Sequence, residues 1–262
     1  MSKIIDLIEK FAAGPERRIG FGQSNEQSDR QLPILIAITN GDAPSPSLSE
    51  SDAIASTIPN LTALKKELSS KRILPWGIWA SDNIDKIIAK VCESKDKKPD
   101  FIAFPSDIQS LEIMQDPDIA TILKLPLSIS PDSLIGMSSI PIDIVTVQLE
   151  HDQEVSLETV GRLGAIRSIV DKPLLLEVSK PIQIPLLALI RDLGVEGLAI
   201  HTSADNPTSV SEIRELLDSI PKKDKRSEKN RPRVSIGSAF SFSVSADEHE
   251  EHEEHEEHEE PQ

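Results

Sequence analysis

The sequence predicts an α/β protein, a (β/α)8 barrel of parallel strands that could be irregular at its first strand. The main observation is a stretch over residues 142–203 in which short apolar runs alternate with helical patterns: Ile142–Glu150, Leu157–Asp171, Lys172–Ser179, Ile182–Gly194 and Val195–Ser203. Short, nearly continuous apolar runs are typical of parallel strands covered by helices. Two consecutive strand-helix-strand units therefore predict a parallel sheet.

The number of strands makes this sheet a barrel. Further strands are expected near Ile19, Ile36, Ile78, Ile102 and Leu127, which gives eight in all. The helices expected between and around them are Ser2–Ala13, about Asp52–Leu68, 83–95, about Asp107–Leu123 and 210–223. Only about ten residues separate the first two strands, too few for a crossover helix, so the irregularity is expected there. An open doubly wound sheet is the alternative, but no Gly-rich phosphate-binding sequence follows any strand.

Composition divides the chain into three parts. We expect a barrel domain with its N-terminal helix over residues 1–221, a linker over 222–245, and an acidic, His/Glu-rich tail of low complexity over 246–262. The tail holds ten carboxylates between Asp247 and Glu260, so it accounts for −10 of the net charge of −16 and leaves −6 for the rest. Such a composition cannot repay the entropy of ordering, and we expect the tail to be disordered.

Charge and composition also exclude several partners. The main basic cluster, Lys222–Arg233, lies in the predicted linker, which argues against nucleic acid as a partner. No run of 18 apolar residues occurs, so no membrane span is expected. The single cysteine, Cys92, excludes an intramolecular disulfide and fits a reducing cytoplasm. A small molecule is the remaining partner class, and the oligomeric state stays open.

Three segments resemble a known family. The runs IDIVTVQLEHD, LETVGRLGAIRSIVDKPLLLEVSKP and LIRDLGVEGLAIHTS are similar to the central part of flavin-dependent aldolase-type barrels, dihydroorotate dehydrogenases in particular. The resemblance implies a (β/α)8 barrel. However, Glu177 stands where that family has its flavin-contacting lysine, His201 stands where it has asparagine, and the chain has no Gly-Gly pair. We therefore expect no flavin or other organic cofactor and carry over no catalytic residue.

The candidate site comes from the strand ends. In such barrels the chemistry lies at the C-terminal ends of the strands, where inward and outward side chains alternate. A charge at Glu177 would not be tolerated against the helices, so this side chain should point inward. The same alternation brings Gln148, Glu177 and His201 together at the barrel mouth, where a carboxylate beside an imidazole can form an acid/base pair.

Further charged residues are expected near this site, and Glu177 also has an alternative role. Lys180, Asp82 and Asp107, at or just beyond strand ends, could add charge for a substrate. Alternatively, Glu177 could have a structural role only, paired in the core with an arginine such as Arg18.

The tail suggests a metal site. Its histidines recur every three residues, at His249, His252, His255 and His258. On a helix, neighbouring pairs could chelate a divalent cation such as Ni²⁺ or Zn²⁺. A solvating tail or a segment that docks a partner is the other interpretation.

Two function classes follow. One is an enzyme that acts on a small polar or anionic metabolite at the C-terminal strand ends. The other is a non-catalytic barrel, a scaffold or accessory protein whose tail binds metal or partners. No GxSxG, HExxH, CxxC, Walker or GxGxxG sequence decides between them.

Overall fold

The computed structural model describes residues 2–13, 33–39, 50–57, 74–80, 85–86, 88, 98–109, 111–149, 156–179, 182–202 and 210–220. All of them belong to one compact unit, Met1–Lys222. The linker and tail expected over 222–245 and 246–262 lie outside the described residues, as does Cys92. The domain boundaries therefore stay predictions.

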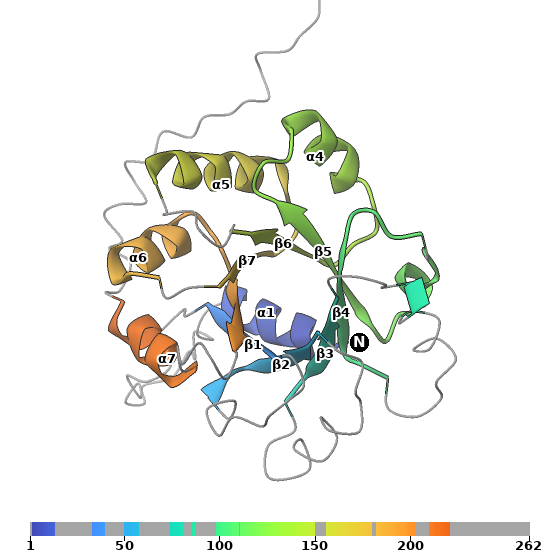
Figure 1. Cartoon of the computed structure of the whole chain (residues 1–262), viewed down its shortest axis with the longest axis horizontal. Helices are drawn as coiled ribbons and strands as arrows, with labels where there is room; N and C mark the ends of the chain where they lie inside the picture. Colours follow the sequence, from blue (N-terminus) through green and yellow to red (C-terminus); the bar gives the residue numbers. More distant parts are fainter. Residues whose placement is uncertain are drawn as a thin grey trace, which may run out of the picture. The chain divides into compact units, whose positions relative to one another are not determined.

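Eight parallel strands form a closed barrel in sequence order (Figure 1). The barrel closes where β1 pairs with β8, from Ile34 opposite Gly197 to Thr39 opposite Thr202. The predicted fold class is thus confirmed. The strands are β1 (Ile34–Thr39), β2 (Ala53–Ser56), β3 (Trp76–Trp79), β4 (Phe101–Pro105), β5 (Ala120–Pro126), β6 (Ile144–Gln148), β7 (Leu174–Val178) and β8 (Gly197–Thr202).

The prediction for the second strand was wrong. A helix was expected from about Asp52, but β2 begins at Ala53 and pairs with β1 and β3. Within its four residues, the small side chains of Ala53 and Ala55 point into the barrel interior. Alanine favours a helix by intrinsic propensity, so the local sequence predicted the wrong conformation. The residues near Ile19, expected as the first strand, lie outside the described part of the chain, and the eight strands close without them.

The fifth strand also begins earlier than predicted. In place of a helix over about Asp107–Leu123 and a strand near Leu127, the chain forms a short 3-10 helix, η3 (Leu111–Gln115), and then β5. Pro126 ends this strand, whereas it was expected to precede one. The β-branched residues Thr121 and Ile122 favour the extended conformation, and all five residues from Phe101 to Pro105 pair with β5.

Helices follow the later strands and pack outside the barrel (Figure 1). They are α4 (Pro131–Ser138), α5 (Leu157–Ile169), α6 (Ile184–Asp192) and α7 (Val210–Ser219). Ser156 caps α5 in a capping box with Thr159. Outward side chains such as Leu176 and Ile200 pack with Leu163 and Leu187 of these helices in one large apolar cluster. This layer explains the nearly continuous apolar runs of the sequence.

The first helix fills one end of the barrel. The helix α1 (Lys3–Ala13) places Ile4 and Ile8 in a cluster with inward residues such as Ile34 and Leu175. Both isoleucines are buried. Figure 1 looks along the barrel and shows α1 across its opening. This end is the N-terminal one, because α1 is bound by Asp100, immediately before β4.

Two glycines let large side chains fill the interior. A Cβ at Gly77 would lie 2.4 Å from the Phe101 ring, and one at Gly197 would lie 2.6 Å from Leu175 Cδ2. Phe101 and Leu175 are fully buried. The barrel is therefore packed by alternating large and small residues and is not a pore.

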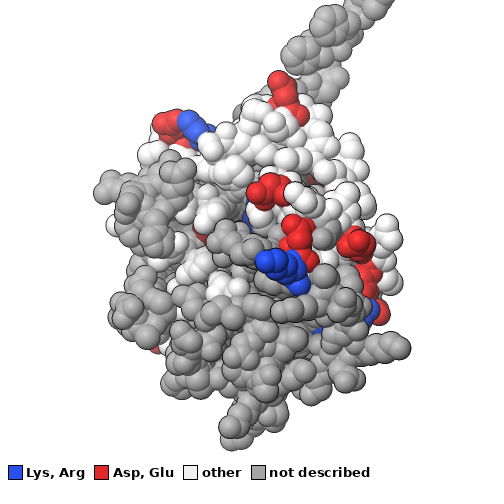
Figure 2. Space-filling model, turned by 45° about the vertical axis from the view of Figure 1, so that its right-hand side comes forward, with Lys and Arg blue, Asp and Glu red and all other residues white. Residues whose placement is uncertain are grey.

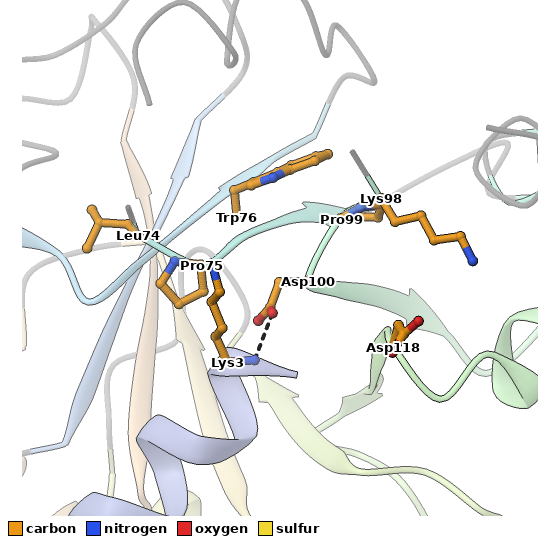
Figure 3. Close-up of a pocket in the computed structure, with 8 residues that line it drawn as sticks. All are labelled: Lys3, Leu74, Pro75, Trp76, Lys98, Pro99, Asp100 and Asp118. Carbon is orange, nitrogen blue, oxygen red and sulfur yellow. Dashed lines mark hydrogen bonds between the residues drawn. The ribbon is translucent and has the colours of Figure 1, made fainter. Parts of the chain in front are cut away.

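An acidic residue precedes each even-numbered strand at this end. Asp52 accepts a hydrogen bond from Leu35 N, Asp143 from Thr121 N, and Glu196 from Leu174 N, each at the start of the preceding strand. Asp100 differs, since it caps α1 by accepting from Lys3 N at 2.7 Å and Ile4 N at 2.8 Å (Figure 3). These carboxylates satisfy backbone N–H groups that have no partner in the sheet.

A cleft of about 310 Å³ lies beside this cap. Figure 3 shows the residues that line it: Lys3, Leu74, Pro75, Trp76, Lys98, Pro99, Asp100 and Asp118. Asp100 is already bound to α1, and the N-terminal end of such barrels serves stability. The cleft is therefore not our candidate site.

The described surface has mixed charge. On the face shown in Figure 2, acidic and basic side chains are interspersed and no extended basic patch forms among the described residues. None of the helices in the described ranges is long and apolar enough to cross a membrane.

Replacing Asp100 by alanine should lower the free energy of unfolding by about 1–3 kcal/mol, because the first N–H groups of α1 would lose their acceptor. Urea denaturation of the two proteins measures this. The exposed Asp171→Ala is the control and should stay within about 0.5 kcal/mol of the unmodified protein. Equal stability of Asp100→Ala and the control would contradict the capping role.

Candidate functional site at the C-terminal end of the barrel

Two of the three predicted site residues are in direct contact. Glu177 and His201 come from the adjacent strands β7 and β8, and Glu177 Oε1 lies 2.8 Å from His201 Nε2. Gln148, at the end of β6, is the partner of Glu177 across the strand pair, and its side chain is exposed. All three residues lie at or next to the last residue of their strands, which places them at one end of the barrel. The inward direction predicted for Glu177 explains its contact with His201.

A lysine that the sequence analysis did not single out completes the cluster. Lys124 Nζ, from β5, lies 3.6 Å from Glu177 Oε2 and donates a hydrogen bond to Ala80 O at 3.3 Å. It also lies 5.7 Å from the centre of the Trp79 ring. Because the prediction placed a helix over about Asp107–Leu123 and the next strand near Leu127, Lys124 was not assigned to a strand. The sequence feature that could have identified Lys124 is a single charge within the apolar run ATILKLP. Lys124 follows inward-facing Ala120 and Ile122 at every second position, so it faces inward as well.

The carboxyl of Glu177 is held in its ionised form. Burial raises its pKa, but the hydrogen bond to His201 and the charge of Lys124 outweigh burial, and the pKa of Glu177 lies below its usual value. The indole of Trp79 acts in the same direction, and so does the positive charge of His201 when its ring is protonated on both nitrogens. The ionised carboxylate therefore stabilises the fold above its ordinary pKa, and this contribution is lost as the pH falls through the lowered pKa.

Ionisation of Glu177 fixes the tautomer of His201. A carboxylate only accepts hydrogen bonds, so His201 Nε2 must carry the proton. In the neutral imidazole the other nitrogen, Nδ1, then has a free lone pair. Among the described residues Nδ1 has no hydrogen-bond partner. An oriented imidazole with one open basic nitrogen is the arrangement that a general base requires.

Three buried polar atoms nearby lack hydrogen-bond partners in the described part of the chain. They are Trp79 Nε1, Thr146 Oγ1 and Glu177 Oε2. The indole of Trp79 lowers the pKa of Glu177, although Trp79 Nε1 makes no hydrogen bond among the described residues. Buried polar groups are nearly always satisfied, so a concentration of exceptions indicates a functional site more than a structural one.

The residues of the cluster differ in their exposure to solvent. The exposed fraction of the side chain rises from 1% for Glu177 to 11% for Lys124 and 31% for His201. Lys124 and His201 both contact the same carboxylate, and His201 is the more exposed of the two.

Other predicted residues are not part of the cluster. Asp107 is exposed just after β4. Lys180, Asp82 and Arg18 lie outside the described residues, as do the tail histidines His249, His252, His255 and His258. The partners of Glu177 in the structure are Lys124 and His201 rather than an arginine. Within the described ranges no group of three or more His, Cys, Asp or Glu side chains could hold a metal ion.

Fold and site together define a (β/α)8 barrel with a polar cluster at its C-terminal end. Solved structures of the same fold include a mutant of the tryptophan synthase alpha-subunit from Pyrococcus furiosus, with a TM-score of 0.54 and 12% identity over 72% of this chain and 97% of that one. The tryptophan synthase complex from the same organism gives 0.51 and 10% over the same shares. Thiamine phosphate pyrophosphorylase from P. furiosus gives 0.49 and 15%, over 71% and 94%.

These likenesses concern the fold alone, since the identities are so low. No protein-family model matches the sequence, and no curated protein matches it. Nothing found in these comparisons supports the flavin-dependent features of the family that residues 142–203 resemble.

Nitrogen NMR of histidine-labelled protein should find the neutral form of His201 protonated at Nε2 and unprotonated at Nδ1. The reason is that ionised Glu177 accepts only from an N–H group. In Glu177→Gln this preference should weaken, because an amide can also donate. A spectrum with the proton on Nδ1 in the unmodified protein would contradict the assignment.

Proposed function

We propose that this barrel is an enzyme that acts on a small polar metabolite by general acid-base catalysis at its C-terminal end. One observation carries the proposal: an ionised, buried carboxylate, Glu177, holds His201 Nε2 at 2.8 Å and leaves Nδ1 as an open base. In this role His201 is the catalytic base. Glu177 is a positioning residue that fixes its tautomer and supports the imidazolium formed after proton transfer.

Lys124 and Gln148 supply the polar contacts that would orient a metabolite. Lys124 is held inside the mouth by the Ala80 carbonyl and the Trp79 ring, and Gln148 stands at the rim beside Glu177. A few convergent polar groups on rigid strands are typical of small-molecule sites. The tail is not needed for this function, and a metal site at its histidines stays a separate prediction.

The second candidate function is a non-catalytic barrel, a scaffold or accessory protein. In that case the Glu177–Lys124 pair would serve only the fold. Three unsatisfied buried polar atoms favour the enzyme, because a purely structural network would be expected to satisfy them.

Screening purified full-length protein against a set of small polar metabolites by ligand-detected NMR tests the proposal. At least one metabolite should bind and shift the His201 ring signals. Glu177→Gln should remain folded but bind it about ten- to a hundredfold more weakly, because an uncharged amide holds the tautomer and orientation of His201 less firmly.

The matched control is Glu158→Gln, an exposed residue of α5 paired with Arg162, which should bind like the unmodified protein. Absence of any bound metabolite, or equal binding by Glu177→Gln, would refute the enzyme. Unfolding of Glu177→Gln would assign the carboxylate to the fold and support the scaffold.

A further inference from the structure

The Lys124 ammonium has unused hydrogen-bonding capacity. It carries three N–H donors. One is used on Ala80 O at 3.3 Å, and Glu177 Oε2 at 3.6 Å lies beyond hydrogen-bonding distance. No other acceptor of Lys124 occurs among the described residues, although only 11% of the side chain is exposed. A charged group so little hydrated should have acceptors, so the open donors indicate a position for an oxygen atom of a ligand.

The charge of the cluster limits what that ligand is. Lys124 is the only Lys or Arg among the described inward-facing side chains of the strands, and Glu177 already balances it. A doubly charged phosphate group needs several cations or an array of backbone N–H groups. One balanced ammonium is better suited to a carbonyl oxygen, which becomes negative only during a reaction.

We propose that Lys124 binds the carbonyl oxygen of the substrate, and that the enzyme converts small aldehydes, ketones or 2-oxo acids into their enolates. This inference rests on the proposed function and names its substrate class. His201 takes the proton, and Lys124 is the catalytic group that stabilises the oxygen.

The step balances without a further reactant. The C–H bond next to the carbonyl breaks, and its proton goes to His201 Nδ1. The electron pair of that bond forms a carbon–carbon double bond, and the carbonyl π electrons move to the oxygen, where the Lys124 ammonium stabilises the negative charge. The imidazolium, held by Glu177, exchanges its proton with solvent and returns one to the same carbon, which completes an exchange. In a 2-hydroxy carbonyl compound the proton can instead go to the former carbonyl carbon while the hydroxyl proton moves to the other oxygen, which completes an isomerisation.

The geometry supports this division of roles. His201 Nε2 contacts Oε1 of Glu177, whereas Lys124 approaches Oε2 of the same carboxylate. The base, His201 on β8, and the group that stabilises the oxygen, Lys124 on β5, therefore lie against the two oxygens of the Glu177 carboxylate on β7. In the proposed reaction a small carbonyl compound contacts both groups at once.

Exchange of carbon-bound hydrogen with D2O tests the proposal. Full-length protein is incubated with dihydroxyacetone, pyruvate or 2-oxobutyrate, and proton NMR follows the loss of the signal next to the carbonyl. At least one compound should exchange faster with protein than in buffer alone. Lys124→Met should slow this exchange about a hundredfold, as expected for the loss of one oxyanion donor.

Matched variants separate the outcomes. Lys98→Met, which removes a lysine paired with Asp116 at the other end of the barrel, should exchange at the unmodified rate. If Lys124→Met does not fold, Lys124→Gln takes its place and should show the same loss. Exchange no faster than in buffer with all three compounds, or full exchange by the Lys124 variant, overturns the proposal. A metabolite that binds in the Glu177-dependent manner but causes no exchange leaves the acid-base enzyme standing and refutes only this substrate class.

Discussion

Closure of the barrel between β1 and β8 is the constraint on which the other features depend. Once Ile34 to Thr39 pair with Gly197 to Thr202, alternate residues of every strand must point into one enclosed space. At the N-terminal end that space is filled by apolar side chains and covered by α1. At the other end the same alternation brings Lys124, Glu177 and His201 together. Fold and site are therefore consequences of one geometric rule.

The two ends of the barrel use carboxylates for different purposes. Asp52, Asp143 and Glu196 accept hydrogen bonds from strand N–H groups, and Asp100 caps α1. These groups replace missing backbone partners. Glu177 instead faces the side chains of His201, Lys124 and Trp79, and one of its oxygens has no hydrogen bond among the described residues. This difference supports a chemical role for Glu177.

The sequence predicted some of this arrangement for clear reasons. An isolated charge in the apolar run LLLEV had to point inward, and period-two alternation then predicted the neighbourhood of His201 and Gln148. The strand β2 was missed because four residues with two alanines carry little β signal, and tertiary pairing decided their conformation. Lys124 was missed because a strand boundary was misplaced by a few residues, and boundaries depend on long-range pairing that local patterns do not contain.

The central claim is that the fold does not need the polar cluster, since apolar residues could fill its place, and that the cluster serves chemistry. The double variant Lys124→Met/Glu177→Leu tests this most directly. Replacing a buried ion pair by apolar residues of similar volume should leave the free energy of unfolding unchanged or raise it by about 1–4 kcal/mol, while metabolite binding at the mouth is lost. Urea denaturation and ligand-detected NMR on the same preparation measure both quantities. A double variant that loses several kcal/mol, or that binds the metabolite unchanged, would contradict the account.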